Sequence, residues 1–360
     1  MESYRVLGLM SGTSLDGLDL ALVDVQKEPS QNWSFQLIAG ETRNYSEELR
    51  SRIRSAPTLS AEEFCRLDHF LGVYYAECVN DFLSIGHIPK DSIDLIVSHG
   101  QTIFHRPEEQ LTVQIACGDT LAALTGIPVV NDFRKRDVQH GGQGAPLVPI
   151  GDFKLFGDQA EAFLNIGGYC NISYRHSGEI RAFDICPGNI VLNYLANQLG
   201  AEYDKGGALS RKGSLLPDLL EKLNRLDFYQ MQPPKSLGNE WLEANVLPLL
   251  NTETPIEDQL YTFSQHIAEQ LSRSFEELGL KRVMVSGGGA LNDFLMEEIA
   301  KRFSGDLFIP EPEVIHLKEA IVFAFLGVLH QRGEANCLAS VTGASKNVCG
   351  GIYHPVERPK

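Results

Sequence analysis

One glycine-rich run constrains the fold of this chain more than any other feature, because it joins two short apolar segments of β-strand character at 4–9 and 18–25. The run from Gly8 to Asp19 holds three glycines, three hydroxyl residues and two acids. An ordinary hairpin turn needs only one or two special residues. A turn so rich in backbone N–H and hydroxyl donors favours an anion, and phosphate is the best candidate. A flexible surface loop is the alternative interpretation.

The same plan appears twice along the chain. In each half three expected strands come first, and helices and strands then alternate, although the two halves share negligible sequence identity. The opening strands are expected at 4–9, 18–25 and 34–39, and again at 163–166, 169–174 and 180–185. The later elements are expected as helices at 46–55, 60–84, 120–125, 187–199, 255–278 and 291–303, and as strands at 94–98, 128–131 and 282–286. This duplication predicts an α/β fold of two lobes, each with a βββαβαβα core.

Two further segments carry local signals. Thr254 and Glu257 are placed to form a capping box at the start of the helix at 255–278, which Gly279 would end. By contrast, 201–250 is rich in loop residues and shows few clear periods. It is expected to be an insertion near the substrate.

Composition narrows the class of protein. A length of 360 residues favours two domains. No apolar run approaches the roughly 20 residues of a membrane span, and the first residues lack a signal-peptide pattern. The seven cysteines are scattered without a Cys-x-x-Cys pair, as expected for a cytoplasmic protein. The net charge of −16 disfavours nucleic acid as a partner.

Asp184 is the strongest candidate for an acid with a chemical role. It lies at the end of an expected strand, just before a helix that begins near Pro187. A carboxylate there would face the crevice at the end of the strand, where it could accept a proton during phosphoryl transfer. An N-cap role for the following helix explains the position equally well.

Other polar motifs have simpler alternatives. The turn at Asn165–Gly168 and the run Ser286–Gly289 could each bring backbone N–H groups close to a ligand, but a plain turn explains either one. Arg134 follows an expected strand and could pair with a carboxylate or a phosphate. The three histidines considered as metal ligands match no common zinc spacing; they are His99, His105 and His140.

Taken in order, these motifs resemble those of the anhydro-N-acetylmuramic acid kinases, a family of the sugar-kinase/Hsp70/actin superfamily. The resemblance covers nearly the whole chain. It is carried by the segments 12–19, 98–102, 131–134, 165–168, 183–184, 187–189, 286–289, 318–320 and 340–343. The chain departs from the family at Ile185-Cys186, where other members often have Thr-Gly.

The resemblance implies a two-lobed fold with ATP in a central cleft. The first lobe would comprise 1–135 and return with 338–360, and the second would comprise 136–337. The implied reaction is ATP-dependent phosphorylation of 1,6-anhydro-N-acetylmuramic acid with hydrolytic opening of the anhydro ring. Its products are N-acetylmuramic acid 6-phosphate and ADP, in the recycling of cell-wall peptidoglycan.

The resemblance also assigns roles to residues. Asp184 is the implied catalytic base, and Ser98, His99, Arg134 and Glu319 are the implied sugar contacts. The implied ATP contacts are Gly12, Thr13, Ser14, Leu15, Asp16, Gly17, Leu18, Asp19, Asn165, Gly167, Gly168, Gly287, Gly288 and Gly289. Mg²⁺ would offset phosphate charge with few protein ligands, so no residue is assigned to the metal.

Two alternatives from other classes stay open. One is a kinase for a different amino sugar, in which Asp184 would deprotonate a free hydroxyl. The other is a non-enzymatic nucleotide-dependent switch of the same fold, which would tolerate loss of Asp184. We expect small-molecule partners, no membrane partner, and allow for a homodimer.

Overall fold

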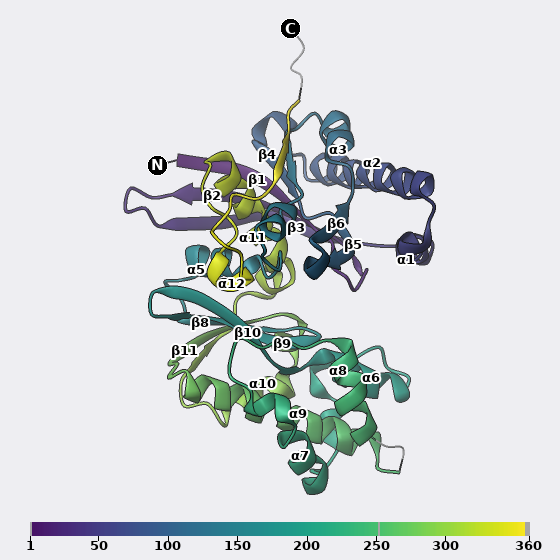
Figure 1. Cartoon of the computed structure of the whole chain (residues 1–360), viewed down its shortest axis with the longest axis vertical. Coiled ribbons are helices and arrows are strands. Elements are labelled where there is room, and N and C mark those ends of the chain that lie inside the picture. Colours follow the sequence, from purple (N-terminus) through teal and green to yellow (C-terminus); the bar gives the residue numbers. More distant parts are fainter. Residues whose placement is uncertain (1, 251–252, 357–360) are drawn as a thin grey trace. The chain divides into compact units, whose positions relative to one another are not determined.

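The computed structural model describes residues 2–250 and 253–356, which form two compact units (Figure 1). Unit 1 runs to Phe156 and resumes at Leu317, and unit 2 comprises Gly157–His316. The sequence placed these boundaries at 135/136 and 337/338. They differ because two helices from the intervening stretches pack on the first sheet, as described next.

Unit 1 is built on a six-stranded sheet with the order β13-β7-β4-β1-β2-β3. β1 pairs antiparallel with β2 and parallel with β4, and β7 continues the parallel part. The last strand, β13, pairs antiparallel with β7 at the edge. The strands are β1 (Glu2–Met10), β2 (Gly17–Lys27), β3 (Trp33–Asn44), β4 (Leu95–Ser98), β7 (Val129–Asn131) and β13 (Ile352–His354).

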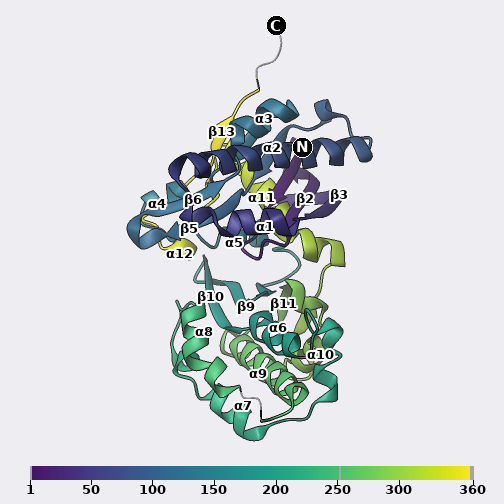
Figure 2. The same cartoon turned by 90° about the vertical axis from the view of Figure 1, so that its right-hand side faces the viewer.

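Helices cover both faces of this sheet (Figure 2). On one face, Leu7 and Leu9 of β1 join a buried cluster with α2 and α3. Because side chains alternate along a strand, Gly8 faces the other way, where a Cβ would lie 2.0 Å from the Ala320 carbonyl oxygen of α11. The helices are α1 (Glu47–Arg54), α2 (Ala61–Ile85), α3 (Gly118–Thr125), α4 (Lys135–Gln139), α5 (Val148–Leu155), α11 (Pro312–Gln331) and α12 (Ala339–Thr342).

The contacts of α5 and α11 explain the position of the domain boundaries. Phe156, directly after α5, packs edge-to-face on Phe35 of β3 with ring centroids 5.0 Å apart. Gly327 of α11 lies against Val97 of β4. Helix α5 and the part of α11 from Leu317 onward therefore belong to unit 1, and the chain returns to unit 1 at Leu317 rather than near Leu338.

Unit 2 repeats the topology of unit 1. Its five-stranded sheet has the order β10-β9-β8-β11-β12, which matches β3-β2-β1-β4-β7 strand for strand. The predicted duplication is confirmed. The strands are β8 (Ala162–Ile166), β9 (Tyr169–His176), β10 (Glu179–Pro187), β11 (Arg282–Ser286) and β12 (Asp306–Phe308), and the helices are α6 (Asn189–Gln198), α7 (Pro217–Asn224), α8 (Asn239–Asn245), α9 (Ile256–Glu277) and α10 (Asp293–Ala300).

Three local expectations fail or are incomplete. The N-cap of α9 is Pro255, which makes no side-chain cap bond, whereas the expected capping box requires Thr254 at that position. The hairpin of β5 (Gln101–Arg106) and β6 (Leu111–Ile115) was not predicted, nor was β12. The stretch 201–250 contains α7 and α8 together with short 3₁₀ turns, whose individual lengths are too small to produce a clear apolar period.

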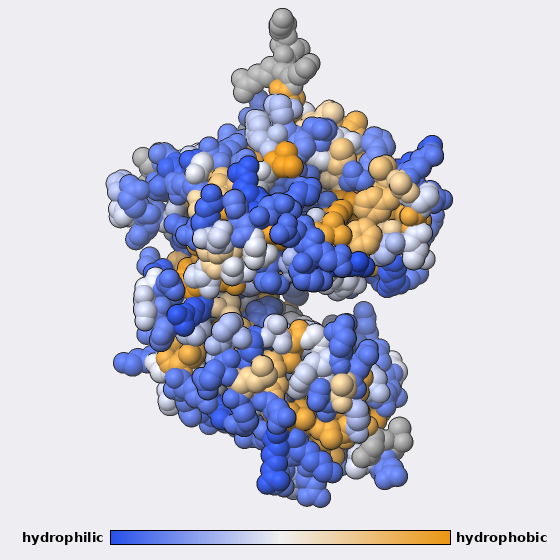
Figure 3. Space-filling view, viewed as in Figure 1, coloured by the Kyte–Doolittle hydropathy of each residue, from blue (hydrophilic) through white to orange (hydrophobic). Residues whose placement is uncertain are grey.

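The face drawn in Figure 3 is mostly hydrophilic, with apolar side chains in small groups. Within residues 2–250 and 253–356, no helix has both the length and the apolarity that a membrane span requires. All seven cysteines lie in these ranges and are free thiols.

Candidate active site

The first glycine-rich turn is a rigid support with an exposed tip. Pairing of β1 with β2 ends at Met10 and Asp19, and Leu15 between them has a positive φ of 60°. Its side chain is buried, as is that of Leu18. Thr13, Ser14 and Asp16 are exposed. The leucines can therefore offer a ligand only backbone groups, whereas the tip offers both hydroxyl and N–H donors.

A buried hydrogen-bond network holds this turn from beneath. The Ser11 hydroxyl donates to Gln101 Oε1 at 2.6 Å and accepts from the Tyr45 hydroxyl at 2.8 Å. Gln101 Nε2 donates to the Gly12 carbonyl at 3.3 Å. Ser11, Gln101 and Tyr45 are all nearly inaccessible to solvent. Their shared bonds fix the turn relative to β5 and to the Tyr75 hydroxyl, which lies 3.1 Å from that of Tyr45.

His99 links the same turn to Arg134. Its Nδ1 lies 3.1 Å from the Ser11 carbonyl oxygen, which assigns the proton to Nδ1. Its Nε2 then accepts from Arg134 Nε at 3.1 Å and Nη2 at 2.9 Å. Burial and the Arg134 charge lower the pKa of His99 to about 3. The imidazole is therefore neutral, and it acts as a bridge.

The burial of Ser98 and His99 bears on their expected contact with the sugar. The Ser98 side chain is fully buried and its hydroxyl accepts from the Gly100 N–H at 3.1 Å. His99 is 5% exposed and both its ring nitrogens are engaged. In this structure the two side chains support the turn and Arg134 instead of facing a ligand.

Arg134 and Glu319 form the polar part of unit 1 that can face a ligand. Arg134 is half-buried, and its Nη1 donates to the Gly144 carbonyl at 2.6 Å. Glu319 follows Lys318, whose Nζ pairs with buried Asp152 at 2.9 Å. Although the Glu319 side chain reaches solvent, loss of water around its carboxyl raises its pKa, and the charges of Lys318 and Arg134 oppose that shift.

In unit 2, the second glycine turn packs on the start of α6. The turn between β8 and β9 contains Gly167 and Gly168, whose carbonyls accept from the N–H groups of Asn189 at 2.9 Å and Gly188 at 2.8 Å. A Cβ at Gly188 would lie 2.8 Å from the Gly167 carbonyl oxygen. Only glycine allows this approach, so the Pro187–Asn189 motif and the turn form one unit.

The third glycine motif joins them. Gly287 has a φ of 82°, and a Cβ there would lie 2.5 Å from Asn165 Oδ1. A Cβ at Gly289 would lie 2.1 Å from Ile166 Cγ2. A Cβ at Gly288 would lie 3.6 Å from Asn189 Nδ2, an ordinary van der Waals distance. The structure thus brings together the turn at Asn165–Gly168, the segment Pro187–Asn189 and the run Ser286–Gly289, of which the last is about 120 residues from the first in the sequence.

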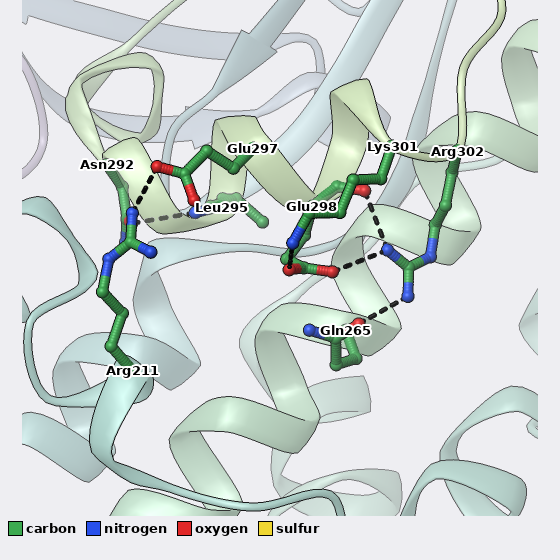
Figure 4. Close-up of polar contacts among 8 residues, drawn as sticks. All are labelled: Arg211, Gln265, Asn292, Leu295, Glu297, Glu298, Lys301 and Arg302. Carbon is green, nitrogen blue, oxygen red and sulfur yellow. Dashed lines mark hydrogen bonds and ion pairs between the residues drawn. The ribbon is translucent and has the colours of Figure 1, made fainter.

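The helix after this motif is fixed by side-chain contacts (Figure 4). Asn292 Oδ1 accepts from the Leu295 N–H at 3.1 Å and so caps α10. Farther along, buried Glu298 accepts from Lys301 at 2.6 Å and from Arg302 at 2.9 Å. The remaining contacts pair Arg211 with Glu297 and Arg302 with Gln265. These contacts hold α10, and with it the preceding glycines, against α9.

Asp184 lies in the sheet beside the second turn. It belongs to β10 and faces Asn171 of β9 in the register, next to a bulge between Asp184 and Cys186. Its Oδ2 accepts from the Leu237 N–H at 2.8 Å. The carboxyl is half-buried, and burial raises its pKa, whereas the bond from Leu237 acts in the opposite direction.

This geometry rules out the N-cap interpretation of Asp184. The N-cap of α6 is Gly188, with no side-chain bond. Ile185 and Cys186, at the point where the resemblance leads us to expect Thr-Gly, are both buried in the core of unit 2. Their side chains therefore contribute packing here and present no polar group to a ligand.

Sequence reasoning missed the groups that hold these residues in place. Gln101 lies in the segment 98–102, but nothing in that pattern predicts its support of the glycine turn. Tyr45 could not be predicted as part of the network, because its partner Ser11 is 34 residues away in the sequence. The segment with Lys235 and Leu237 lies in the stretch expected to be a loop-rich insertion near the substrate, and its backbone makes two hydrogen bonds with Asp184. In the described ranges, no three His, Cys, Asp or Glu side chains gather as a metal site.

Comparison with known proteins identifies the family. A model of the family described as anhydro-N-acetylmuramic acid kinase matches residues 4–355. The chain belongs to this family. Proteins named anhydro-N-acetylmuramic acid kinase include one from Shewanella denitrificans, 36% identical over 368 residues, with 96% of this chain and 97% of that protein covered. Another, from Saccharophagus degradans, is 36% identical over 387 residues, with 99% of this chain and 100% of that protein covered. A third, from Legionella pneumophila, is 34% identical over 372 residues, with 97% of this chain and 98% of that protein covered.

Membership in the anhydro-N-acetylmuramic acid kinase family confirms the resemblance drawn from the motifs. The match spans almost every residue of the chain, so it includes the elements that position all three glycine motifs and Asp184. The duplicated sheet topology agrees with the two-lobed α/β fold expected of this family.

Proposed function

We propose that this chain transfers the γ-phosphoryl group of ATP to 1,6-anhydro-N-acetylmuramic acid while water opens the anhydro ring. The products are N-acetylmuramic acid 6-phosphate and ADP. The observation that carries the reaction type is the environment of Asp184, a half-buried carboxyl beside a glycine turn. Because burial raises its pKa, this carboxylate is a better proton acceptor than a fully hydrated one.

The proposed step balances around one water molecule. Asp184 takes a proton from the water, and the water oxygen forms a bond to C1 of the sugar. The bond between C1 and O6 breaks, and O6 forms a bond to the γ-phosphorus as the bond to ADP breaks. The Leu237 N–H bond to Asp184 Oδ2 at 2.8 Å leaves Oδ1 as the acceptor.

The nucleotide contacts are assigned to the glycine motifs. The exposed tip at Thr13, Ser14 and Asp16, with the partly exposed Gly12, supplies hydroxyl and backbone N–H donors to phosphate, and Leu15, Gly17 and Leu18 contribute through the backbone. Asn165, Gly167 and Gly168 are assigned to the phosphates from unit 2. The motif at Gly287, Gly288 and Gly289 is assigned to the adenosine side, where three glycines allow a flat ring to approach.

The sugar contacts are assigned to Arg134 and Glu319. A guanidinium matches the lactyl carboxylate of the substrate, which it can bind through two parallel bonds. His99 and Ser98 act indirectly, because His99 orients Arg134 through Nε2. The Ser98 hydroxyl accepts a hydrogen bond from the Gly100 N–H and so supports the backbone next to His99.

Mg²⁺ would accompany ATP. The carboxylates near the first turn suit it, because hard cations prefer oxygen ligands and magnesium keeps much of its water. Asp19 in the turn and Glu319 interact electrostatically, and the Asp19 charge contributes to the raised pKa of Glu319. No residue is assigned to the ion, and the bound ion would offset phosphate charge.

The proposed setting is the recycling of peptidoglycan sugars in the cytoplasm, with ATP and the amino sugar as partners. Incubation with ATP, Mg²⁺ and the anhydro sugar in ¹⁸O-labelled water tests the reaction. We expect one heavy oxygen at C1 of the 6-phosphate product. A product without the label would contradict hydrolytic opening.

Two controls separate the alternatives. Faster phosphorylation of N-acetylglucosamine than of the anhydro sugar would indicate a kinase for a different amino sugar. ATP binding without any sugar phosphorylation would indicate a nucleotide-dependent switch. Asp184→Asn distinguishes these cases further, since only an enzyme that uses the carboxylate as a base loses its function.

A further inference from the structure

Unit 2 contains a cavity whose lining lies outside the glycine motifs. Its volume is about 440 Å³, within the range of small-molecule sites. Its walls come from β9 and β10, the segment 229–235 and the last turns of α9. Tyr174, Phe183 and Tyr229 give it aromatic walls, and the rings of Tyr174 and Phe183 meet edge-to-face at 5.8 Å.

The charge of this cavity is opposite to that of the chain. Four cationic residues line it, and they are Arg175, Arg181, Arg273 and Lys235, whereas Glu277 is the one acid among the lining residues. The whole chain carries a net charge of −16. A local excess of positive charge around a concave surface concentrates anions there.

Hydrogen bonds and ion pairs engage three of these cationic side chains to different degrees. Arg273 pairs with Glu277 at 2.8 Å, but Arg181 lies 3.9 Å from Glu179, at the limit of an ion pair. Lys235 is held in place, with Nζ donating to the Phe228 carbonyl at 3.1 Å and lying 4.7 Å from the Phe228 ring centroid. Burial lowers the pKa of Lys235, the charge of Glu277 opposes that shift, and the charge of Arg273 adds to it.

We propose that this cavity binds a small sugar phosphate, with its phosphate among the arginines and its ring against Tyr174 and Phe183. A phosphate dianion matches the excess of positive charge, and guanidinium groups bind phosphate through two parallel bonds. The aromatic walls suit the apolar face of a sugar ring. The ligand is either the product of the proposed reaction or a sugar phosphate formed elsewhere, since both carry the same recognised group.

The cavity is connected to Asp184 by one short segment. Lys235, in the cavity wall, accepts through its carbonyl from the Asp184 N–H at 3.0 Å. Two residues later, Leu237 donates to the Asp184 carboxylate at 2.8 Å. A ligand that orders the segment 229–235 therefore also affects the position of this carboxylate, and we expect it to change kcat more than the KM for ATP.

Calorimetric titration of the full chain with glucose 6-phosphate tests the site, with glucose as the matched neutral probe. Arg175→Gln/Arg181→Gln should weaken binding of glucose 6-phosphate at least tenfold. Arg225→Gln, an exposed arginine outside the cavity paired with Glu221, should leave it unchanged. No saturable binding in the millimolar range, equal binding of glucose, or equal affinity in the double variant would each overturn the proposal.

Two further measurements complete the test. Titration with N-acetylmuramic acid 6-phosphate identifies the source, because much tighter binding than glucose 6-phosphate indicates product and similar binding indicates a general sugar phosphate. The binding assay needs no turnover, so it stands apart from the proposed kinase reaction. If bound glucose 6-phosphate leaves kcat unchanged in an active preparation, the connection through Leu237 is refuted.

Discussion

Replacing Gln101 with methionine tests whether the buried network supports the first glycine turn. Methionine has a similar length and volume, so little cavity results. The change removes the acceptor of the Ser11 hydroxyl at 2.6 Å and the donor to the Gly12 carbonyl at 3.3 Å. Because both Ser11 and Gln101 are 1% exposed, water cannot replace these bonds. A buried polar group left without a partner costs about 1–3 kcal/mol.

We therefore expect Gln101→Met to lower the free energy of unfolding of unit 1 by about 2 kcal/mol. The KM for ATP should rise, since the turn at Gly12 loses its support, while kcat changes less. The two tryptophans are Trp33 in unit 1 and Trp241 in unit 2. Urea unfolding followed by fluorescence in a Trp241→Phe background therefore reports unit 1 alone.

The matched control is Gln36→Met, because Gln36 is exposed on β3. It should alter the free energy of unfolding by no more than about 0.5 kcal/mol, as surface substitutions usually do. If Gln101→Met had an effect as small as the control and left the KM for ATP unchanged, the network would not support the turn.

Three other predictions follow from single environments. Asp184→Asn should reduce kcat by roughly 10²- to 10⁴-fold while the affinity for ATP, measured by fluorescence titration, is kept. Near-normal turnover would refute the role of Asp184 as the catalytic base. Burial lowers the pKa of His99 and His266 to about 3, so the unfolded chain binds protons first as the pH falls below about 6.5. Urea unfolding should then show stability falling between about pH 6.5 and 3, by up to about 1.4 kcal/mol per pH unit for each histidine, and a flat profile would contradict this. Gly289→Ala places a Cβ 2.1 Å from Ile166 Cγ2 and should destabilise unit 2 by about 1–3 kcal/mol in thermal unfolding. If the variant were as stable as the parent chain, the backbone around Gly289 would adjust to a Cβ at no cost.

Several features of this protein could be predicted from its sequence because they depend on neighbours along the chain. Apolar periods located the helix α9 and the three strands that open each unit, since each element buries one face. The glycine motifs located turns, because positive φ and close backbone approach favour glycine. The order of the motifs was sufficient to recognise the family.

Other features depended on tertiary contacts. Whether α11 belongs to unit 1 is decided by Gly8, whose missing side chain admits the Ala320 carbonyl of that helix. The capping box expected at Thr254 shows the same limit at short range, because the N-cap of α9 is Pro255, which makes no side-chain cap bond. A local sequence pattern is compatible with several helix starts and helix–strand contacts, and tertiary packing determines which of them forms.

The roles of individual polar residues were decided only by the fold. His99 and Arg134 are 35 residues apart, yet one imidazole nitrogen accepts from the guanidinium. Asp184 meets Leu237 across 53 residues. The sequence by itself determined the succession of the opening strands in each half, the turns and the family, since these follow from local patterns. Tertiary structure decided which groups are buried and which partner each one meets, because burial and hydrogen bonding depend on atoms brought together from distant parts of the chain.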